Sequence, residues 1–282
     1  ADLPASHRQL IRFVPDKDKQ RSPLDAARRN LLPFLRRAFR HPVSKEDCEP
    51  FAQLVSATVK EGESFTTAMQ VGVQAILVSP HFLFRVEQDR QPDNPDQHHR
   101  LSDFELATRL SYFLWSSMPD EELLTLAEKD QLHRADVLEK QVERMLRDKR
   151  AVALVDNFAS QWLNLRILDE LVPDPKLFPQ FNDRLRSEMQ TETRMFFDSV
   201  LRDNRSIVDL LDGRFTFVNE SLAKFYGIEG VQGEEFRRID LPGDRRAGVL
   251  THASILTLTS NSDRTSPVKR GKWILENILD MP

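Results

Sequence analysis

The stretch "NDRLRSEMQTETRMFFDSVLR", residues 182–202, decides the fold class of this 282-residue chain. Leu185, Met189, Phe196 and Val200 recur at the spacing of one helix face. This pattern predicts one long amphipathic helix over 182–202, with its apolar face directed into a core.

The same face carries one acidic residue. The spacing of the apolar residues places Glu192 among them. An unpaired buried charge costs several kcal/mol, so this carboxylate should be protonated or paired with an Arg or Lys from another segment. Such a pair is either a structural ion pair or a carboxylate tuned for proton transfer or substrate binding. Glu188, one turn earlier, is expected in solvent or at the edge of the face.

Further helix-start signals lie on both sides of this stretch. Three serines are each followed three residues later by an acid, which complements the positive end of the helix dipole. These pairs are Ser22 and Asp25, Ser44 and Asp47, and Ser102 and Glu105. Pro33 is expected to kink or split the first of these helices. Other helices are predicted near 64–79, 135–148, 150–166 and 219–226.

Only two short segments, 215–218 and 236–241, suggest strands. The predicted fold is therefore all-α: a multi-helix bundle with two or three helical sub-domains and at most a minor β-hairpin near 215–241. The expected divisions are a linker or the end of an upstream domain at 1–21, a helical sub-domain at 22–88, a linker at 89–100, a central helical domain at 101–228 and a C-terminal segment at 229–282.

Composition argues against several classes of protein. Lys and Arg (40 residues) nearly balance Asp and Glu (44 residues), giving a formal net charge of −4, whereas nucleic-acid binders usually present a strongly basic face. Cys48 is the only cysteine, so neither an intrachain disulfide nor a thiolate metal cluster can form. The apolar runs are too short for a membrane span. Because the chain starts with Ala1 and stops just after a predicted helix, we expect it to be a piece of a longer protein.

The helix start at 266 differs from the others in charge. Ser266 and Pro267 form the usual opening, yet Lys269 and Arg270 follow where the other starts carry acids. Free N–H groups, a hydroxyl and flanking cations make an anion site, which Arg264 and Thr265 would complete. The alternative is that these cations pair within the protein, for example with Glu192. Gly271 suggests a place where a segment or ligand approaches closely.

Other catalytic patterns are absent from the sequence. It contains no P-loop, no nucleophile elbow, no H-E-x-x-H and no dinucleotide fingerprint. His252 is a candidate acid or base, or else a buried structural histidine. No histidine pair accompanies the carboxylates at helical spacing, so no helix-borne metal site is expected.

Five motifs together resemble a known family. They are "ILVSPHFLFRVE", "LATRLSYFLWSSMPDEELLTLA", "FASQWLNLRIL", "MQTETRMFF" and "GVLTHASILTLTSNSDRTSPVKRGKWILENIL". The chain thereby resembles planctomycete-type proteins of unknown function that carry DUF1595, DUF1592 and DUF1588 in this order. The matching positions include Glu192, Arg264, Thr265, Ser266, Arg270 and Gly271.

The resemblance implies an exported protein, in the periplasm or at the cell surface, with a cytochrome-c-like haem domain upstream. Because this sequence has no C-x-x-C-H, any haem c would belong to that other part. The first hypothesis is a helical domain that packs against other domains of its chain and holds a structural or anion-binding polar cluster, with an anionic or saccharide ligand. The alternative is a redox or hydrolytic enzyme acting on a polymer, with Glu192 as acid or base.

Overall fold

The computed structural model describes residues 5–16, 20–87, 94, 100–241, 243 and 245–281. It contains two compact units, Ala1–Glu143 and Arg144–Pro282. Apart from residues 94 and 100, the expected linker at 89–100 lies outside the described residues. The described residues are mostly helical and contain one two-stranded sheet, which confirms the predicted fold class.

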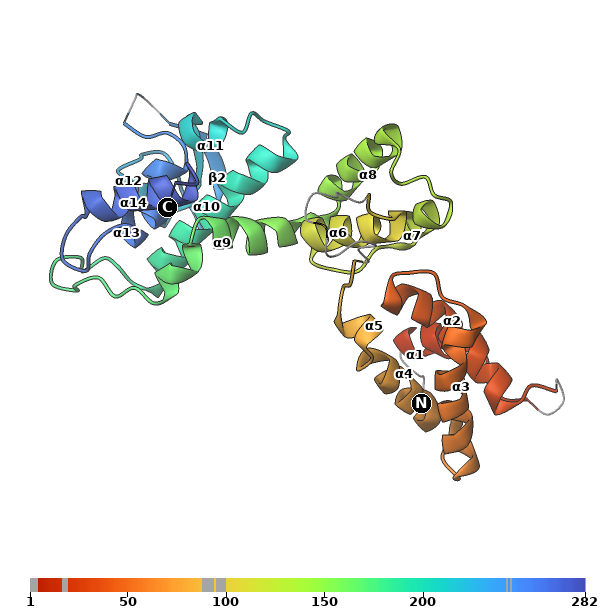
Figure 1. Cartoon of the computed structure of the whole chain (residues 1–282). Helices are drawn as coiled ribbons and strands as arrows, with labels where there is room; N and C mark the ends of the chain where they lie inside the picture. The colour runs from red at the N-terminus through yellow and green to blue at the C-terminus, as the bar shows by residue number, and fades with distance from the viewer. Residues whose placement is uncertain are drawn as a thin grey trace. The chain divides into compact units, whose positions relative to one another are not determined.

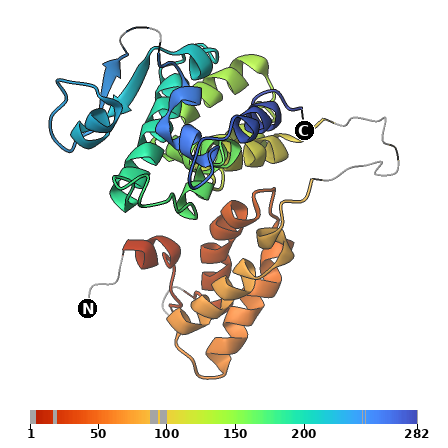
Figure 2. The same cartoon turned by 90° about the vertical axis from the view of Figure 1, so that its left-hand side faces the viewer.

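The first helices of the N-terminal unit share one apolar core. Figure 2 shows α2, α3 and α4 lying side by side. Their bounds are α1 Ala5–Leu10, α2 Pro23–Phe39, α3 Lys45–Lys60, α4 Phe65–Leu77 and α5 Pro80–Leu83. Arg40, which directly follows α2, connects this helix to α5. Its guanidinium donates hydrogen bonds to the backbone carbonyls of His81, Phe82 and Phe84.

The serine caps form as predicted. Ser22, Ser44 and Ser102 each accept a hydrogen bond from the backbone N–H three residues on. The prediction for Pro33 is wrong in one respect, since α2 continues through it without a break. Proline removes one backbone hydrogen bond, and the burial of Leu31 and Leu35 on either side of it holds both halves of α2 in the same core.

Three further helices follow in the N-terminal unit and at its end. They are α6 Asp103–Trp115, α7 Glu121–Glu128 and α8 Ala135–Arg147. Asp103 is the first residue of α6, yet it does not cap the helix, because Ser102 and Glu105 form the capping box. Its carboxylate is therefore available to the turn that follows α7, from which Leu132 donates a backbone hydrogen bond.

The C-terminal unit is built around α10, Asp183–Arg202, the helix predicted at 182–202 (Figure 1). Its other helices are α11 Asp209–Asp212, α12 Glu220–Tyr226, α13 Ala253–Leu258 and α14 Pro267–Asn277. The strands β1 Phe215–Val218 and β2 Arg237–Asp240 pair antiparallel, with Phe215 opposite Asp240 and Val218 opposite Arg237.

The predicted helix at 150–166 is irregular in the structure. It consists of a 3₁₀ turn at Lys149–Ala151, a π-helical stretch at Leu154–Ala159, the short α9 at Ser160–Trp162 and a second 3₁₀ turn at Leu165–Asp169. Phe158 and Trp162 stack on each other, and both rings contact Phe197 of α10. We infer that this aromatic packing favours the wider turn over a regular helix.

Candidate functional site

Glu192 of α10 lies in the interior of the C-terminal unit, with 1% of its surface exposed. Thr216 Oγ1 on β1 donates a hydrogen bond of 2.6 Å to Glu192 Oε1. The Tyr226 hydroxyl, at the end of α12, donates to Oε2. The burial predicted from the periodicity is therefore present. Of the two predicted alternatives, the ion pair is wrong, because neutral hydroxyls hold the carboxylate and no Arg or Lys among the described residues forms a salt bridge with it.

Burial raises the pKa of Glu192 to about 7, even though both hydroxyls and the charge of Arg246 act to lower it. Arg246 lies outside this pair, with its guanidinium 3.8 Å from the centre of the Tyr226 ring. Burial and the adjacent Glu192 also raise the pKa of Tyr226 well above its ordinary value. The tyrosine hydroxyl thus retains its proton and serves as a permanent donor to the carboxylate.

His252 lies in the same interior region, at the start of α13, with 2% of its surface exposed. Its Nδ1 is 3.0 Å from Thr193 Oγ1, which is also 2.7 Å from the Ser254 hydroxyl. Burial, together with the charge of Arg246, lowers the pKa of His252 to about 3, so the ring is neutral at physiological pH. Its edge packs against Phe196.

The buried polar cluster therefore consists of Glu192, Thr193, Thr216, Tyr226, His252 and Ser254. An acid or base in catalysis has to reach the proton that it transfers in a bound substrate. Glu192 and His252 are both enclosed, and neither lines the pocket of about 420 Å³ described below. This geometry favours a structural role over the predicted catalytic one.

Of the two predicted positions for Glu188, the solvent-facing one is wrong. This residue is buried, with 6% of its surface exposed. Asn219 Nδ2 and Arg184 Nε each donate a hydrogen bond to Oε1, at 2.8 and 2.9 Å. Burial acts to raise the pKa of Glu188, but these hydrogen bonds outweigh it, and the pKa falls below its ordinary value. Asn219 also caps α12, so this carboxylate helps to fix α12 on α10.

The basic helix start is present as predicted. The Ser266 hydroxyl accepts a hydrogen bond from the backbone N–H of Lys269, and the first turn of α14 contains no acid. Lys269 Nζ contacts the Ser260 carbonyl at 3.4 Å, and Arg270 Nε contacts Thr259 Oγ1 at 3.4 Å. Neither cation has a carboxylate partner among the described residues.

The sequence suggested that these cations could pair with Glu192, and that pairing does not form. Among the cations of this region, Arg264 pairs instead with its neighbour Asp263, at 2.9 Å. Gly271 does not mark a close approach either, since a Cβ at this position would have no described neighbour within 4 Å. The basic helix start at Ser266 and the buried polar cluster around Glu192 are thus separate features of the C-terminal unit.

Arg264, Thr265 and Arg270 lie together at a pocket of about 420 Å³. Its walls are mainly apolar and come from α10, α12, α13 and the loop before α10; they include Leu185, Met189, Phe178, Phe181, Phe225 and Leu256. The loop at 260–265 is held in place by a bridge between Ser260 and Thr265 and by a hydrogen bond from Asp174 N to the Ser262 carbonyl, at 2.9 Å. Three of the five predicted anion-binding residues therefore share a pocket, while Ser266 caps α14 and Lys269 does not line this pocket.

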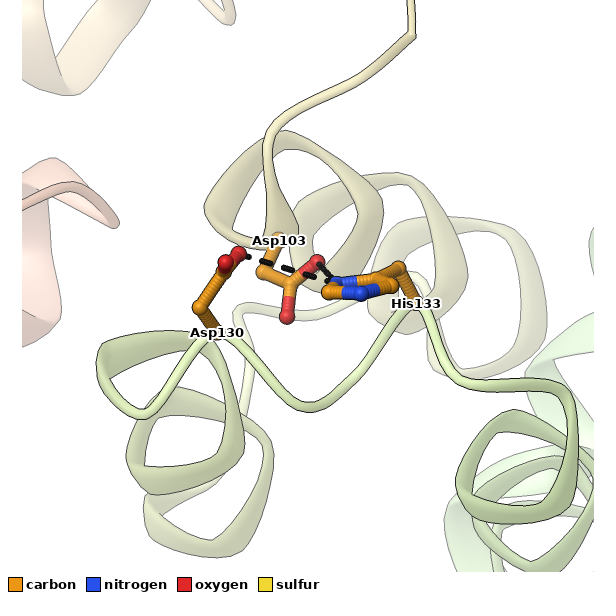
Figure 3. Close-up of side chains that lie close together, drawn as sticks. All are labelled: Asp103, Asp130 and His133. Atoms are coloured by element: carbon orange, nitrogen blue, oxygen red, sulfur yellow. Dashed lines mark hydrogen bonds and ion pairs between the residues drawn. The ribbon is translucent and has the colours of Figure 1, made fainter.

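A second group of polar side chains lies in the N-terminal unit, and the sequence analysis missed it. The ligand atoms of Asp103, Asp130 and His133 all lie within 4.8 Å of one another (Figure 3). His133 Nδ1 is 2.9 Å from Asp103 Oδ1 and 3.6 Å from Asp130 Oδ1. Only the D-x-x-H spacing of Asp130 and His133 is visible in the sequence, because Asp103 precedes His133 by 30 residues.

These features define a mostly helical protein with a buried polar cluster and a pocket of the size that binds small molecules. The chain matches three family models in tandem, each described as a protein of unknown function: DUF1595 (PSD5) over residues 26–87, DUF1592 (PSD4) over 101–228 and DUF1588 (PSCyt3) over 246–282. It therefore carries the three domains that its motifs predicted. No curated protein and no solved structure matches the chain. Among the described residues, no helix is both long and apolar enough to cross a membrane.

The buried polar cluster joins two of these matched regions. Glu192 and Tyr226 belong to the DUF1592 match, whereas His252 and Ser254 belong to the DUF1588 match. Both matched regions also line the pocket: Met189 belongs to the DUF1592 match, and Arg270 belongs to the DUF1588 match. Both matched regions thus contribute to one core and one pocket.

Proposed function

We propose that the C-terminal unit is a ligand-binding domain that takes a small organic anion, with an apolar body and one anionic group, in the pocket at Arg264 and Arg270. The observation that carries this proposal is a mainly apolar pocket with arginines at one side. One of them, Arg270, is partly buried and has no carboxylate partner among the described residues.

The volume and lining support this class of ligand. A pocket of about 420 Å³ lies within the range of small-molecule sites, about 300–1,000 Å³. Walls formed by Phe181, Met189 and Phe225 suit an alkyl or aromatic body better than a sugar, whose hydroxyls need polar partners. A guanidinium binds a carboxylate with two parallel hydrogen bonds, so an organic carboxylate fits the arginines best.

The domain would act within a larger, exported protein associated with cytochrome c. This part of the proposal is supported by the tandem match, and the short name PSCyt3 of the third family points to cytochrome. A haem c domain elsewhere in that protein would be the natural neighbour, in the periplasm or at the cell surface. The helical domain would then bind its ligand without a haem of its own.

A binding experiment with an alkyl carboxylate tests the pocket. We expect dodecanoate to bind the purified chain and Arg270→Ala to weaken this binding about 10- to 100-fold, the loss of one charge-assisted contact. Lys272→Ala is the matched control, because Lys272 lies on the same helix, pairs with Glu276 and does not line the pocket. The affinity for dodecanol, which lacks the charge, should not depend on Arg270.

A second variant tests the apolar walls. Leu256→Trp, at a partly exposed wall position, should fill the pocket and abolish the binding of both compounds, while circular dichroism shows that the fold is retained. Equal affinities for dodecanoate in Arg270→Ala and Lys272→Ala, or undiminished binding in Leu256→Trp, would exclude this pocket as the site.

A further inference from the structure

We propose that Asp103, Asp130 and His133 form a binding site for a divalent transition-metal ion of the zinc type. The three residues lie at the start of α6 and in the turn between α7 and α8, all in the N-terminal unit. This site is distinct from the pocket of the C-terminal unit, and the two proposals stand or fall independently.

The local structure directs three side chains to one point. Ser102 and Glu105 cap α6, so the Asp103 carboxylate is left free to face the turn at 130–133. Asp130 follows α7 in a left-handed backbone conformation, with φ of 52°. Figure 3 shows both carboxylates directed toward the same edge of the His133 ring.

The charge of the cluster is unbalanced without a cation. Asp103 has only 3% of its side chain exposed, and its hydrogen-bond partners are the backbone N–H of Leu132 and the imidazole of His133. No Arg or Lys among the described residues forms a salt bridge with Asp103 or Asp130. Elsewhere in this chain the guanidinium of an arginine commonly meets a carboxylate, as Arg109 does with Glu87.

One imidazole nitrogen cannot satisfy both acids. Nδ1 carries a single proton at most, so it donates to Asp103 or to Asp130 at any moment. The remaining carboxylate then faces a second negative charge within 4.8 Å. A divalent cation bound by Nδ1 and one oxygen from each acid would replace that proton and neutralise both charges.

The distances suit a zinc-type ion. Zinc ligands at about 2.0–2.2 Å in tetrahedral geometry are about 3.3 Å from one another. The two measured distances from His133 Nδ1, 2.9 and 3.6 Å, lie on either side of this value. Asp130 is 87% exposed, so its side chain can rotate to complete the set and solvent can reach the remaining coordination position. Two oxygens and one imidazole nitrogen are a donor set that also accepts Co²⁺.

Binding would connect the start of α6 to the turn after α7. Because the metal binds the folded arrangement of these three residues, it should raise the melting temperature of the chain. The test is titration of the purified, chelator-treated chain with Zn²⁺, followed by calorimetry and by thermal unfolding. Co²⁺ provides a second readout, since its visible absorption reports the coordination geometry.

The decisive variant is Asp130→Asn, because Asp130 is exposed and asparagine tolerates its left-handed backbone conformation. We expect one Zn²⁺ per chain for the wild type and an affinity at least about tenfold lower for Asp130→Asn. Asp136→Asn is the matched control, as Asp136 is also exposed and pairs with Arg134 outside the cluster. His81→Gln controls for adventitious binding at the histidine pair formed by His41 and His81, and it should bind as the wild type does.

The melting temperatures of the metal-free proteins distinguish this metal site from a purely structural role of Asp130. If the Asp130 carboxylate served only as an ion-pair partner of His133, metal-free Asp130→Asn should melt below the wild type. We expect instead an unchanged or higher melting temperature, because a negative charge close to Asp103 is removed. Absence of Zn²⁺ binding by the wild type, or equal affinities in Asp130→Asn and Asp136→Asn, would overturn the proposal.

Discussion

Glu192 and His252 have pKa values shifted in opposite directions within one buried cluster. The pKa of Glu192 rises from 4.5 to about 7, so between these values the folded chain retains a proton that the unfolded chain has released. Stability therefore falls as the pH rises from 4.5 to 7. The pKa of His252 falls from 6.5 to about 3, so stability falls as the pH decreases from 6.5 to 3. The two effects oppose each other between pH 4.5 and 6.5.

Glu192→Gln should remove one of the two opposing effects. Because glutamine does not titrate, the free energy of unfolding of the variant relative to the wild type should increase by about 3 kcal/mol from pH 4.5 to 7. Urea unfolding at several pH values measures this difference. Glu229→Gln, at an exposed position in the same unit, is the matched control. A constant difference between Glu192→Gln and the wild type over this range would show that the Glu192 carboxyl titrates alike in the folded and unfolded chains.

The sequence predicted the burial of Glu192 but not its partners. Burial follows from the spacing of Leu185, Met189 and Phe196 along one helix, which is local information. The partners are hydroxyls that lie 24 and 34 residues further along the chain, and a hydroxyl carries no charge that would identify it as a partner. An argument from charge alone could propose only a cation as the partner of Glu192. It could not say which one, because the chain contains 40 Lys and Arg residues.

At the scale of elements, Tyr226 connects three of them. It ends α12, donates to Glu192 on α10 and accepts a 2.8 Å hydrogen bond from the backbone N–H of Ala253 at the start of α13. Capping signals predicted the helices well because a cap depends on residues three positions apart. The π-helical stretch at Leu154–Ala159 was not predicted, because its packing against Phe197 brings together residues distant in sequence.

Tyr226→Phe should therefore weaken the contact between α10, α12 and α13. It leaves a buried N–H and a buried carboxylate oxygen without their partner, which costs about 1–3 kcal/mol per group. We expect the unfolding midpoint of the C-terminal unit in urea to decrease accordingly. The chain has two tyrosines, and Tyr112→Phe is the control. The Tyr112 hydroxyl lies in the N-terminal unit and accepts a long hydrogen bond, of 3.4 Å, from Arg40. A Tyr226→Phe midpoint equal to that of Tyr112→Phe would mean that the hydroxyl does not stabilise the contact.

At the scale of the whole molecule, the family matches and the compact units divide the chain differently. The DUF1592 match covers 101–228, whereas the second compact unit is Arg144–Pro282. This unit includes part of the DUF1592 match and all of the DUF1588 match. Sequence motifs revealed the order of the domains. They could not reveal that two of them share a core, because that depends on contacts such as those among Phe196, Ile255 and Trp273.

The shared core makes a prediction about fragments. In a fragment of residues 101–282, the part from residue 144 onward should unfold cooperatively, because it contains both sides of the core and the buried polar cluster. A fragment of residues 101–228 lacks His252, Ile255 and Trp273, which would leave Phe196 and Phe215 exposed to water. It should therefore show no cooperative thermal transition by circular dichroism and should bind a hydrophobic dye strongly. If 101–228 unfolded as cooperatively as 101–282, the DUF1592 region would fold independently, and the pocket at Arg270 would lie at a joint between two domains rather than within one unit.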